Sequence, residues 1–135
     1  MKLYLDSSVV IRVVEGERAD REALAARLLA LSGIDGGCVV SDLVYLECLV
    51  KPLALGDAVL QAAYNAFLDS LGTVALTRAV YARAAAIRAE RRFETPDALH
   101  LAAAIEAGCD GFVTGDRGLV GLPDIQVIVI ASSAD

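Results

Sequence analysis

The chain has 135 residues and a mass of 14.1 kDa, enough for one domain with a substantial core. No apolar run approaches the roughly 20 residues of a membrane-spanning helix, and Lys2 leads directly into a strand pattern, so we expect a cytoplasmic protein without a membrane partner. The net charge of −6 lacks the basic footprint of most nucleic-acid binders, although acids that hold a cation would account for part of that charge.

Short apolar runs alternate along the chain with longer segments that have helical spacing. We expect strands over residues 2–6, 38–41 (entered through a glycine turn at 33–37), 73–77, 111–114 and 125–130. Between them we expect helices over residues 7–14, 20–31, 42–50, 57–71, 78–92 and 96–107. The third helix should end before Lys51-Pro52, and the sixth should begin at Thr95-Pro96 with Thr95 as its cap.

Strand runs without polar alternation suit a sheet that is covered on both faces. The pattern therefore predicts an α/β protein with a three-layer, Rossmann-like fold, in which helices flank a central, mostly parallel five-stranded sheet. We expect residues 1–135 to form a single domain. The mean hydropathy of +0.56 leaves two explanations open, namely an apolar surface for a protein partner or a compact alanine-rich core.

Four carboxylates stand where such a fold would bring them together. Sites in open α/β sheets form outside the carboxyl ends of the strands. Asp6 ends the first strand and Asp116 follows the fourth, while Glu47 lies on the helix that leaves the second strand and Asp97 begins the sixth helix. Four like charges cannot share a pocket without a cation, so their convergence would imply a divalent metal site.

Each of these acids also has a simpler explanation. Asp6 could cap the helix that follows it, Asp97 could interact with a helix dipole, and Asp116 could be an ordinary turn residue. Glu47 lies in an otherwise apolar helix and needs a partner, which Lys51 four residues later could supply as a surface ion pair. Among the remaining acids, we expect caps at Asp20 and Asp57 and a solvated charge at Glu15.

These residues, taken in order, resemble the motifs of the PIN-domain ribonucleases, and most closely those of VapC-type toxins from bacterial and archaeal toxin–antitoxin pairs. Residues 4–11, 41–47, 95–104 and 113–116 are similar to the four successive motifs of that family. The resemblance implies a PIN-like fold, with catalytic and metal-binding acids at Asp6, Glu47, Asp97 and Asp116 and a supporting role for Thr114. It makes His100 a core residue, or one that lies behind the site acids.

The resemblance further implies an endoribonuclease that depends on Mg²⁺ or Mn²⁺ and acts as the toxin of a type II toxin–antitoxin pair. A metal-activated water would hydrolyse RNA phosphodiester bonds, with Asp6 and Asp97 as leading ligands, Asp116 sharing the ion and Glu47 acting through water. The implied partners are RNA, a cognate antitoxin and a second copy in a homodimer. The candidate RNA contacts are Arg12, Arg88, Arg91, Arg92 and Arg117, although a helix-dipole role explains Arg91 and Arg92 equally well.

Other classes fit the sequence less well. A non-catalytic PIN-like module that binds RNA or protein remains the main alternative. A phosphoacceptor receiver domain would need an acidic pair before the first helix, and a haloacid-dehalogenase-like phosphatase would need aspartate at position 8, where the chain has Ser8. Three cysteines and one histidine without paired spacing argue against a zinc site or a disulfide framework.

Overall fold

One parallel sheet organises the molecule. The computed structural model describes residues 1–33 and 37–130, so the turn expected at 33–37 lies partly outside the described residues. The strands are β1 (Lys2–Leu5), β2 (Gly37–Ser41), β3 (Gly72–Val74), β4 (Gly111–Thr114) and β5 (Gln126–Val129). They pair in the order β3-β2-β1-β4-β5, and every pairing is parallel. The predicted fold class is therefore confirmed.

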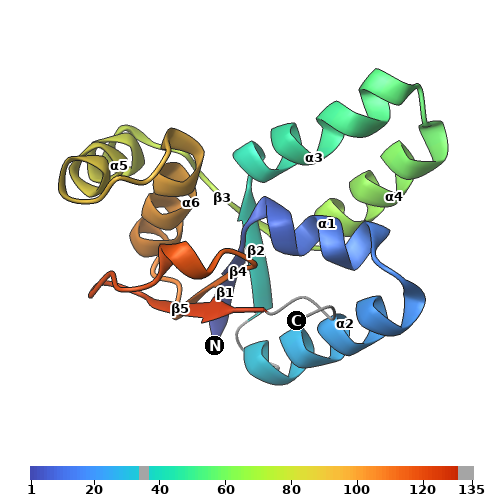
Figure 1. Ribbon diagram of the computed structural model, residues 1–135, viewed down its shortest axis with the longest axis horizontal. Helices are drawn as coiled ribbons and strands as arrows, with labels where there is room; N and C mark the ends of the chain where they lie inside the picture. Colours follow the sequence, from blue (N-terminus) through green and yellow to red (C-terminus); the bar gives the residue numbers. More distant parts are fainter. Residues whose placement is uncertain (34–36, 131–135) are drawn as a thin grey trace.

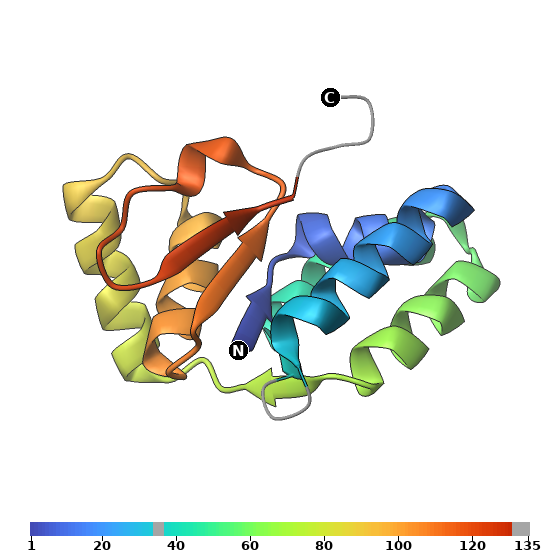
Figure 2. The same cartoon turned by 90° about the horizontal axis from the view of Figure 1, so that it is seen from below.

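Helices cover both faces of the sheet and complete a three-layer arrangement (Figures 1 and 2). One face carries α1 (Ser7–Glu15), α2 (Arg18–Ser32), α3 (Asp42–Leu55) and α4 (Ala58–Asp69), and the other carries α5 (Arg78–Glu90) and α6 (Thr95–Glu106). The core between the layers is filled by apolar side chains such as Leu5, Val9, Leu101 and Phe112, all fully buried. None of the helices in the described residues is long and apolar enough to cross a bilayer.

The order of the strands creates a switch point between β1 and β4. The chain proceeds from β1 to β2 and β3 on one side, and then crosses over to β4 and β5 on the other. Leu5 pairs with Val113, and the backbone N–H of Asp6 donates to the Val113 carbonyl at 3.1 Å before α1 begins. Because connections leave a switch point in opposite directions, a crevice opens there outside the carboxyl ends of the strands.

Helix α3 runs through Pro52 to Leu55, so the predicted end before Lys51 was wrong. Pro52 lies in the last turn, where its missing N–H costs one intrahelical hydrogen bond, and the residue is buried. The helix ends at Gly56, whose φ of 64° provides the left-handed conformation that glycine adopts without strain.

Three other boundaries differ from the predicted ones by a few residues. Strand β3 ends at Val74, and Thr77 caps α5 by accepting from the Val80 N–H at 3.4 Å. Helix α2 begins at Arg18, so Asp20 lies in its first turn and is not its cap. Glu94, not Thr95, occupies the cap position of α6. Asp57 caps α4, as predicted.

Glu15 joins three helices and is not the solvated charge that was predicted. The Lys51 Nζ donates to Glu15 Oε1 at 2.5 Å, and the Tyr64 hydroxyl donates to Glu15 Oε2. These contacts tie the end of α1 to α3 and α4. The alternative explanation of Glu47, a surface pair with Lys51, is therefore wrong, because Lys51 pairs with Glu15.

We expect Glu15→Ala to lower the free energy of unfolding by about 1–3 kcal/mol, because Tyr64, 1% exposed, would lose its acceptor. Lys51 and then Tyr64 hold the pKa of Glu15 below its ordinary value of 4.5. The stability that Glu15 contributes is thus present above pH 4.5 and is lost as the pH falls through the lowered pKa. Urea denaturation at pH 7 and at successively lower pH should show the difference from wild type shrinking.

Glu22→Ala is the matched control, because Glu22 forms an exposed pair with Arg18 at 3.0 Å. Exposed pairs of this kind contribute about 0.5 kcal/mol or less. Equal losses for the two variants at pH 7 would contradict the role assigned to Glu15.

Candidate functional site

A cavity of about 230 Å³ lies at the carboxyl ends of β1 and β4. Its walls are formed by Asp6, Ser7, Ser8, Glu47, Asp97, His100 and Asp116. The four acids singled out in the sequence therefore line one cavity, although they come from four elements: the end of β1, helix α3, the first turn of α6, and the turn after β4.

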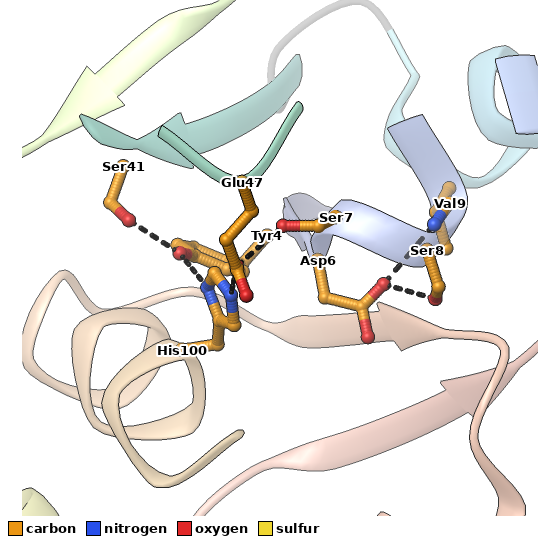
Figure 3. A network of polar contacts seen from close by, with 8 residues as sticks. All are labelled: Tyr4, Asp6, Ser7, Ser8, Val9, Ser41, Glu47 and His100. Carbon is orange, nitrogen blue, oxygen red and sulfur yellow. Dashed lines mark hydrogen bonds and ion pairs between the residues drawn. The ribbon is translucent and has the colours of Figure 1, made fainter. Parts of the chain in front are cut away.

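Asp6 both caps a helix and lines the cavity. Its Oδ1 accepts from the Val9 N–H at 3.2 Å and from the Ser8 hydroxyl at 2.6 Å (Figure 3). Ser8 Oγ in turn accepts from the Gly115 N–H at 3.0 Å and so links Asp6 to the turn after β4. The capping explanation for Asp6 is therefore correct, and it is compatible with a place in the cavity. Ser8 was missed as a site residue, and its only signal was a hydroxyl soon after the strand-ending aspartate.

Asp116 is held from both sides of its turn. Its N–H donates to Oγ1 of the fully buried Thr114 at 3.0 Å, and its Oδ1 accepts from the Gly118 N–H at 2.8 Å. Thr114 thus fixes the backbone of the turn that carries Asp116. The side chain of Asp116 is exposed at the mouth of the cavity.

The pKa of Asp97 responds to the other carboxylates of the cavity. Asp97 is half-buried in the first turn of α6. Burial raises its pKa, the charges of Asp116 and Asp6 raise it further, and His100 opposes them. A cation in the cavity would relieve this repulsion.

Glu47 is anchored by a buried partner. Its Oε1 accepts from the Ser7 hydroxyl at 2.7 Å and lies 2.5 Å from His100 Nε2 (Figure 3). The bond to His100 is the largest cause of a lowered Glu47 pKa, burial opposes it, and the Ser7 bond adds to it. One signal for this contact is present in the sequence, because His100 lies three residues after Asp97 and so on the same face of α6.

Only some of the candidate arginines lie beside the acidic cavity. Arg12 and Arg117 line a wider hollow of about 740 Å³ that shares Ser8 and Asp116 with the acidic cavity. Arg88 lines a separate groove between α5 and α6, while Arg91 donates to the Gly121 carbonyl at 2.6 Å and Arg92 is exposed past the end of α5.

The acids share a cavity without yet forming a set of metal ligands. Across residues 1–33 and 37–130, no group of three or more His, Cys, Asp or Glu side chains is placed so that it could hold a metal ion as it stands. The expected convergence therefore extends to a common cavity and not to ligand distances. The donors nevertheless fit a hard cation, because all four are carboxylates and their mutual repulsion is felt at Asp97.

We expect Asp97→Asn to stabilise the protein at pH 7 when EDTA removes divalent ions. Because the pKa of Asp97 is raised, its favourable contribution is present below its ordinary pKa of 3.8 and is lost as the pH rises through the raised value. The variant should thus unfold at a higher temperature than wild type at pH 7, with the gap closing toward pH 3.8. Asp124→Asn, at an exposed turn before β5, should show no gain, and a less stable Asp97→Asn at pH 7 would contradict the electrostatics described.

Comparison with known proteins agrees with this architecture. The toxin–antitoxin complex from Klebsiella pneumoniae is similar with a TM-score of 0.73 and 20% identity, over 96% of this chain and 97% of that chain. VapBC2 from Rickettsia felis, bound to a DNA fragment from its promoter, has a TM-score of 0.79 and 15% identity, over 96% and 98%. VapC20 from Mycobacterium tuberculosis, a sarcin–ricin loop cleaving toxin, has a TM-score of 0.67 and 17% identity, over 93% and 99%.

At these identities the likeness to solved structures establishes the fold alone. No curated protein matches the chain in sequence. A family match is more extensive, because residues 3–124 match the family described as the PIN domain. Since that match spans nearly the whole chain, the protein belongs to the PIN domain family.

Proposed function

We propose that this protein is an endoribonuclease that requires Mg²⁺ or Mn²⁺ and that it is the toxin of a type II toxin–antitoxin pair. The observation that carries the proposal is the set of four carboxylates, from four separate elements, around one cavity at the switch point of the sheet. Membership of the PIN domain family supports it, as do similar structures that are described as a toxin–antitoxin complex and as a sarcin–ricin loop cleaving toxin.

Asp6, Asp97 and Asp116 are the residues that would hold the ion. Asp6 and Asp116 each use Oδ1 to accept from a backbone N–H, and among the described residues no hydrogen bond engages the second carboxylate oxygen of either, which would be the one to bind a ligand. When bound, Mg²⁺ or Mn²⁺ supplies charge neutralisation at the scissile phosphate and lowers the pKa of water. Glu47, whose Oε1 is already engaged, would orient the attacking water or bind the ion through water.

Arg12 and Arg117 would bind the RNA backbone beside the acids. Both line the hollow that adjoins Asp116, and a guanidinium can bind a phosphate through two hydrogen bonds. Positive charge is needed there, because the net charge of −6 would otherwise repel RNA. Arg88, Arg91 and Arg92 would extend the contact past the end of α5.

The proposed protein partners are a cognate antitoxin and a second copy of the chain. Large apolar side chains are exposed on α3 and α4, among them Leu46, Val50, Leu53 and Val59. A segment of the antitoxin that offers arginine would complement the carboxylates and block the cavity. As a toxin that acts on cellular RNA, the protein would work in the cytoplasm.

The competing function is a PIN-like module that binds RNA or protein without cutting. The lack of ready-made ligand geometry in the described residues is the observation that favours it. Incubation of the purified protein with total cellular RNA, with millimolar Mn²⁺ or Mg²⁺ and with excess EDTA, separates the two functions. We expect fragments that appear only with the metal. RNA that is bound but stays intact at every metal concentration would support the module instead.

A further inference from the structure

We propose that His100 is the positioning residue of this site. Its hydrogen bond to Oε1 holds the Glu47 side chain against the inner wall of the cavity, so that Glu47 acts through Oε2 alone. The inference rests on the proposed function, because it assigns Glu47 a single working oxygen in the nuclease reaction. The role of His100 follows neither from the negative charge of the cavity nor from the choice of metal.

His100 is the central member of a buried chain of polar groups. The Ser41 hydroxyl lies 2.7 Å from the Tyr4 hydroxyl, which lies 2.7 Å from His100 Nδ1, while His100 Nε2 lies 2.5 Å from Glu47 Oε1 (Figure 3). Ser41 is 1% exposed, Tyr4 0% and His100 3%. The chain thus starts in the sheet, passes through α6 and ends at the cavity wall on α3.

The hydrogen bonds have a direction that follows from their chemistry. An ionised carboxylate only accepts, so His100 Nε2 carries the proton that bonds to Glu47. When the ring is neutral, Nδ1 is then an acceptor, so the Tyr4 hydroxyl donates to it and the Ser41 hydroxyl donates to Tyr4. Burial raises the pKa of Tyr4 far above its ordinary value, so Tyr4 keeps the proton it donates. In that state each donor points toward Glu47, and each bond polarises the next.

The ring of His100 has little freedom to leave this arrangement. Tyr4 stacks on Phe112, with ring centroids 5.6 Å apart and planes 8° from parallel, and it lies tilted against the His100 ring at 5.7 Å. The Tyr4 hydroxyl is thereby held at one point beside Nδ1. Because Tyr4 belongs to the sheet, this packing holds the His100 ring, and through it the Glu47 carboxylate on α3, in a fixed position relative to the sheet.

The anchor matters because without it only the Ser7 hydroxyl would hold the Glu47 carboxylate. The Glu47 side chain is 32% exposed, and a glutamate has three rotatable bonds. Both hydrogen bonds to its carboxylate, from Ser7 and His100, fall on Oε1, and within the described residues none falls on Oε2. Groups held in place before the reaction lower its barrier, whereas a displacement of about 1 Å can cost 10²-fold in rate.

The first test is independent of any activity. His100 is the single histidine of the chain, so ¹⁵N spectra of the imidazole report on this residue alone. We expect the Nε2–H tautomer in the wild type, with a slowly exchanging Nε2–H proton that Glu47→Ala exposes to exchange. An Nδ1–H tautomer in the wild type, or a proton unaffected by Glu47→Ala, would overturn the inference.

The second test measures RNA cleavage in the full-length protein. Loss of a residue that supports a metal-site group typically costs 10–100-fold, so we expect His100→Leu to lower kcat by about that factor with KM for RNA little changed. His100→Gln, which keeps an N–H donor, should recover most of the loss. Tyr4→Phe should lower kcat by roughly fivefold, the factor that corresponds to a net hydrogen-bond contribution of about 1 kcal/mol. Tyr64→Phe, which also removes a hydroxyl from a buried tyrosine, should leave kcat unchanged.

A double-mutant cycle separates positioning from a general effect on folding. If His100 acts through Glu47, His100→Leu should cause no further loss of activity in a Glu47→Ala background. A further loss of the same size would show that His100 acts elsewhere and would overturn the inference.

The proposed nuclease function and the positioning role of His100 can be contradicted separately. If the wild type cuts RNA with Mn²⁺ and His100→Leu cuts it equally fast, the role of His100 is contradicted and the proposed function is not. A wild type that cuts no RNA, with the Nε2–H tautomer present and lost on Glu47→Ala, would sink the proposed function and reduce His100 to a structural anchor.

Discussion

Replacing Asp6 with asparagine is expected to lower the rate of metal-dependent RNA cleavage by about 10²–10³-fold while the protein stays folded, an effect of the size seen when one charge-stabilising group is removed from an active site. Asparagine caps helices as well as aspartate does, so the Val9 N–H keeps its acceptor. The charge that would hold the ion is lost. Initial rates on one RNA substrate, at saturating Mn²⁺, give the comparison.

The matched control is Asp124→Asn, which removes an equal charge from an exposed turn outside the cavity. It should cut RNA at the wild-type rate. Asp6→Asn with full activity would mean that Asp6 is only the cap of α1, and that the cleavage comes from another site or from a contaminant.

Divalent metal is expected to stabilise the folded protein by about 2.7 kcal/mol when its concentration is 100 times its Kd, because a ligand that binds only the folded state shifts the unfolding equilibrium. Asp97→Asn should lose most of that gain. Since the same variant should be the more stable one in EDTA, the two proteins are expected to exchange their order as Mn²⁺ is added. Denaturant unfolding with and without Mn²⁺ measures both gaps.

An unchanged free energy of unfolding at millimolar Mn²⁺ would mean that the cavity takes up no ion. Ca²⁺ or Mg²⁺ in place of Mn²⁺ checks that the effect belongs to hard divalent cations in general. Stabilisation of equal size in Asp97→Asn would place the bound ion elsewhere on the protein.

The sheet could be predicted because its strands carry their own signal. Uninterrupted apolar runs such as that of β4, buried at every position, are typical of strands covered on both faces. The place of the acids followed from the same reasoning, since the carboxyl ends of parallel strands share one edge. The shared cavity could therefore be located from Asp6, which directly follows β1, and Asp116, which lies two residues after the neighbouring strand β4.

The partners of the acids could not be predicted, because they are set by packing between segments far apart in sequence. His100 and Glu47 are 53 residues apart, and Lys51 reaches Glu15 across 36 residues instead of its helical neighbour Glu47. Local spacing favoured the near partner, whereas the docking of α3 between α1 and α4 selected the distant one. Pro52 illustrates the same limit, since the helix continues through this buried residue despite the local preference to end before proline.

The distances between the acids are a separate matter. Sequence position gives the edge of the sheet that each carboxylate faces, but a ligand distance depends on side-chain rotamers. Those rotamers respond to charge, and a cation would draw together the carboxylates that, after burial, raise the pKa of Asp97.

The most direct test of the account is a crystal grown or soaked with Mn²⁺ and measured at a wavelength where manganese scatters anomalously. We predict an anomalous peak inside the cavity of about 230 Å³, bonded to carboxylate oxygens of Asp6, Asp97 and Asp116. No peak there at a Mn²⁺ concentration that supports RNA cleavage, or a peak only at other residues, would contradict the account.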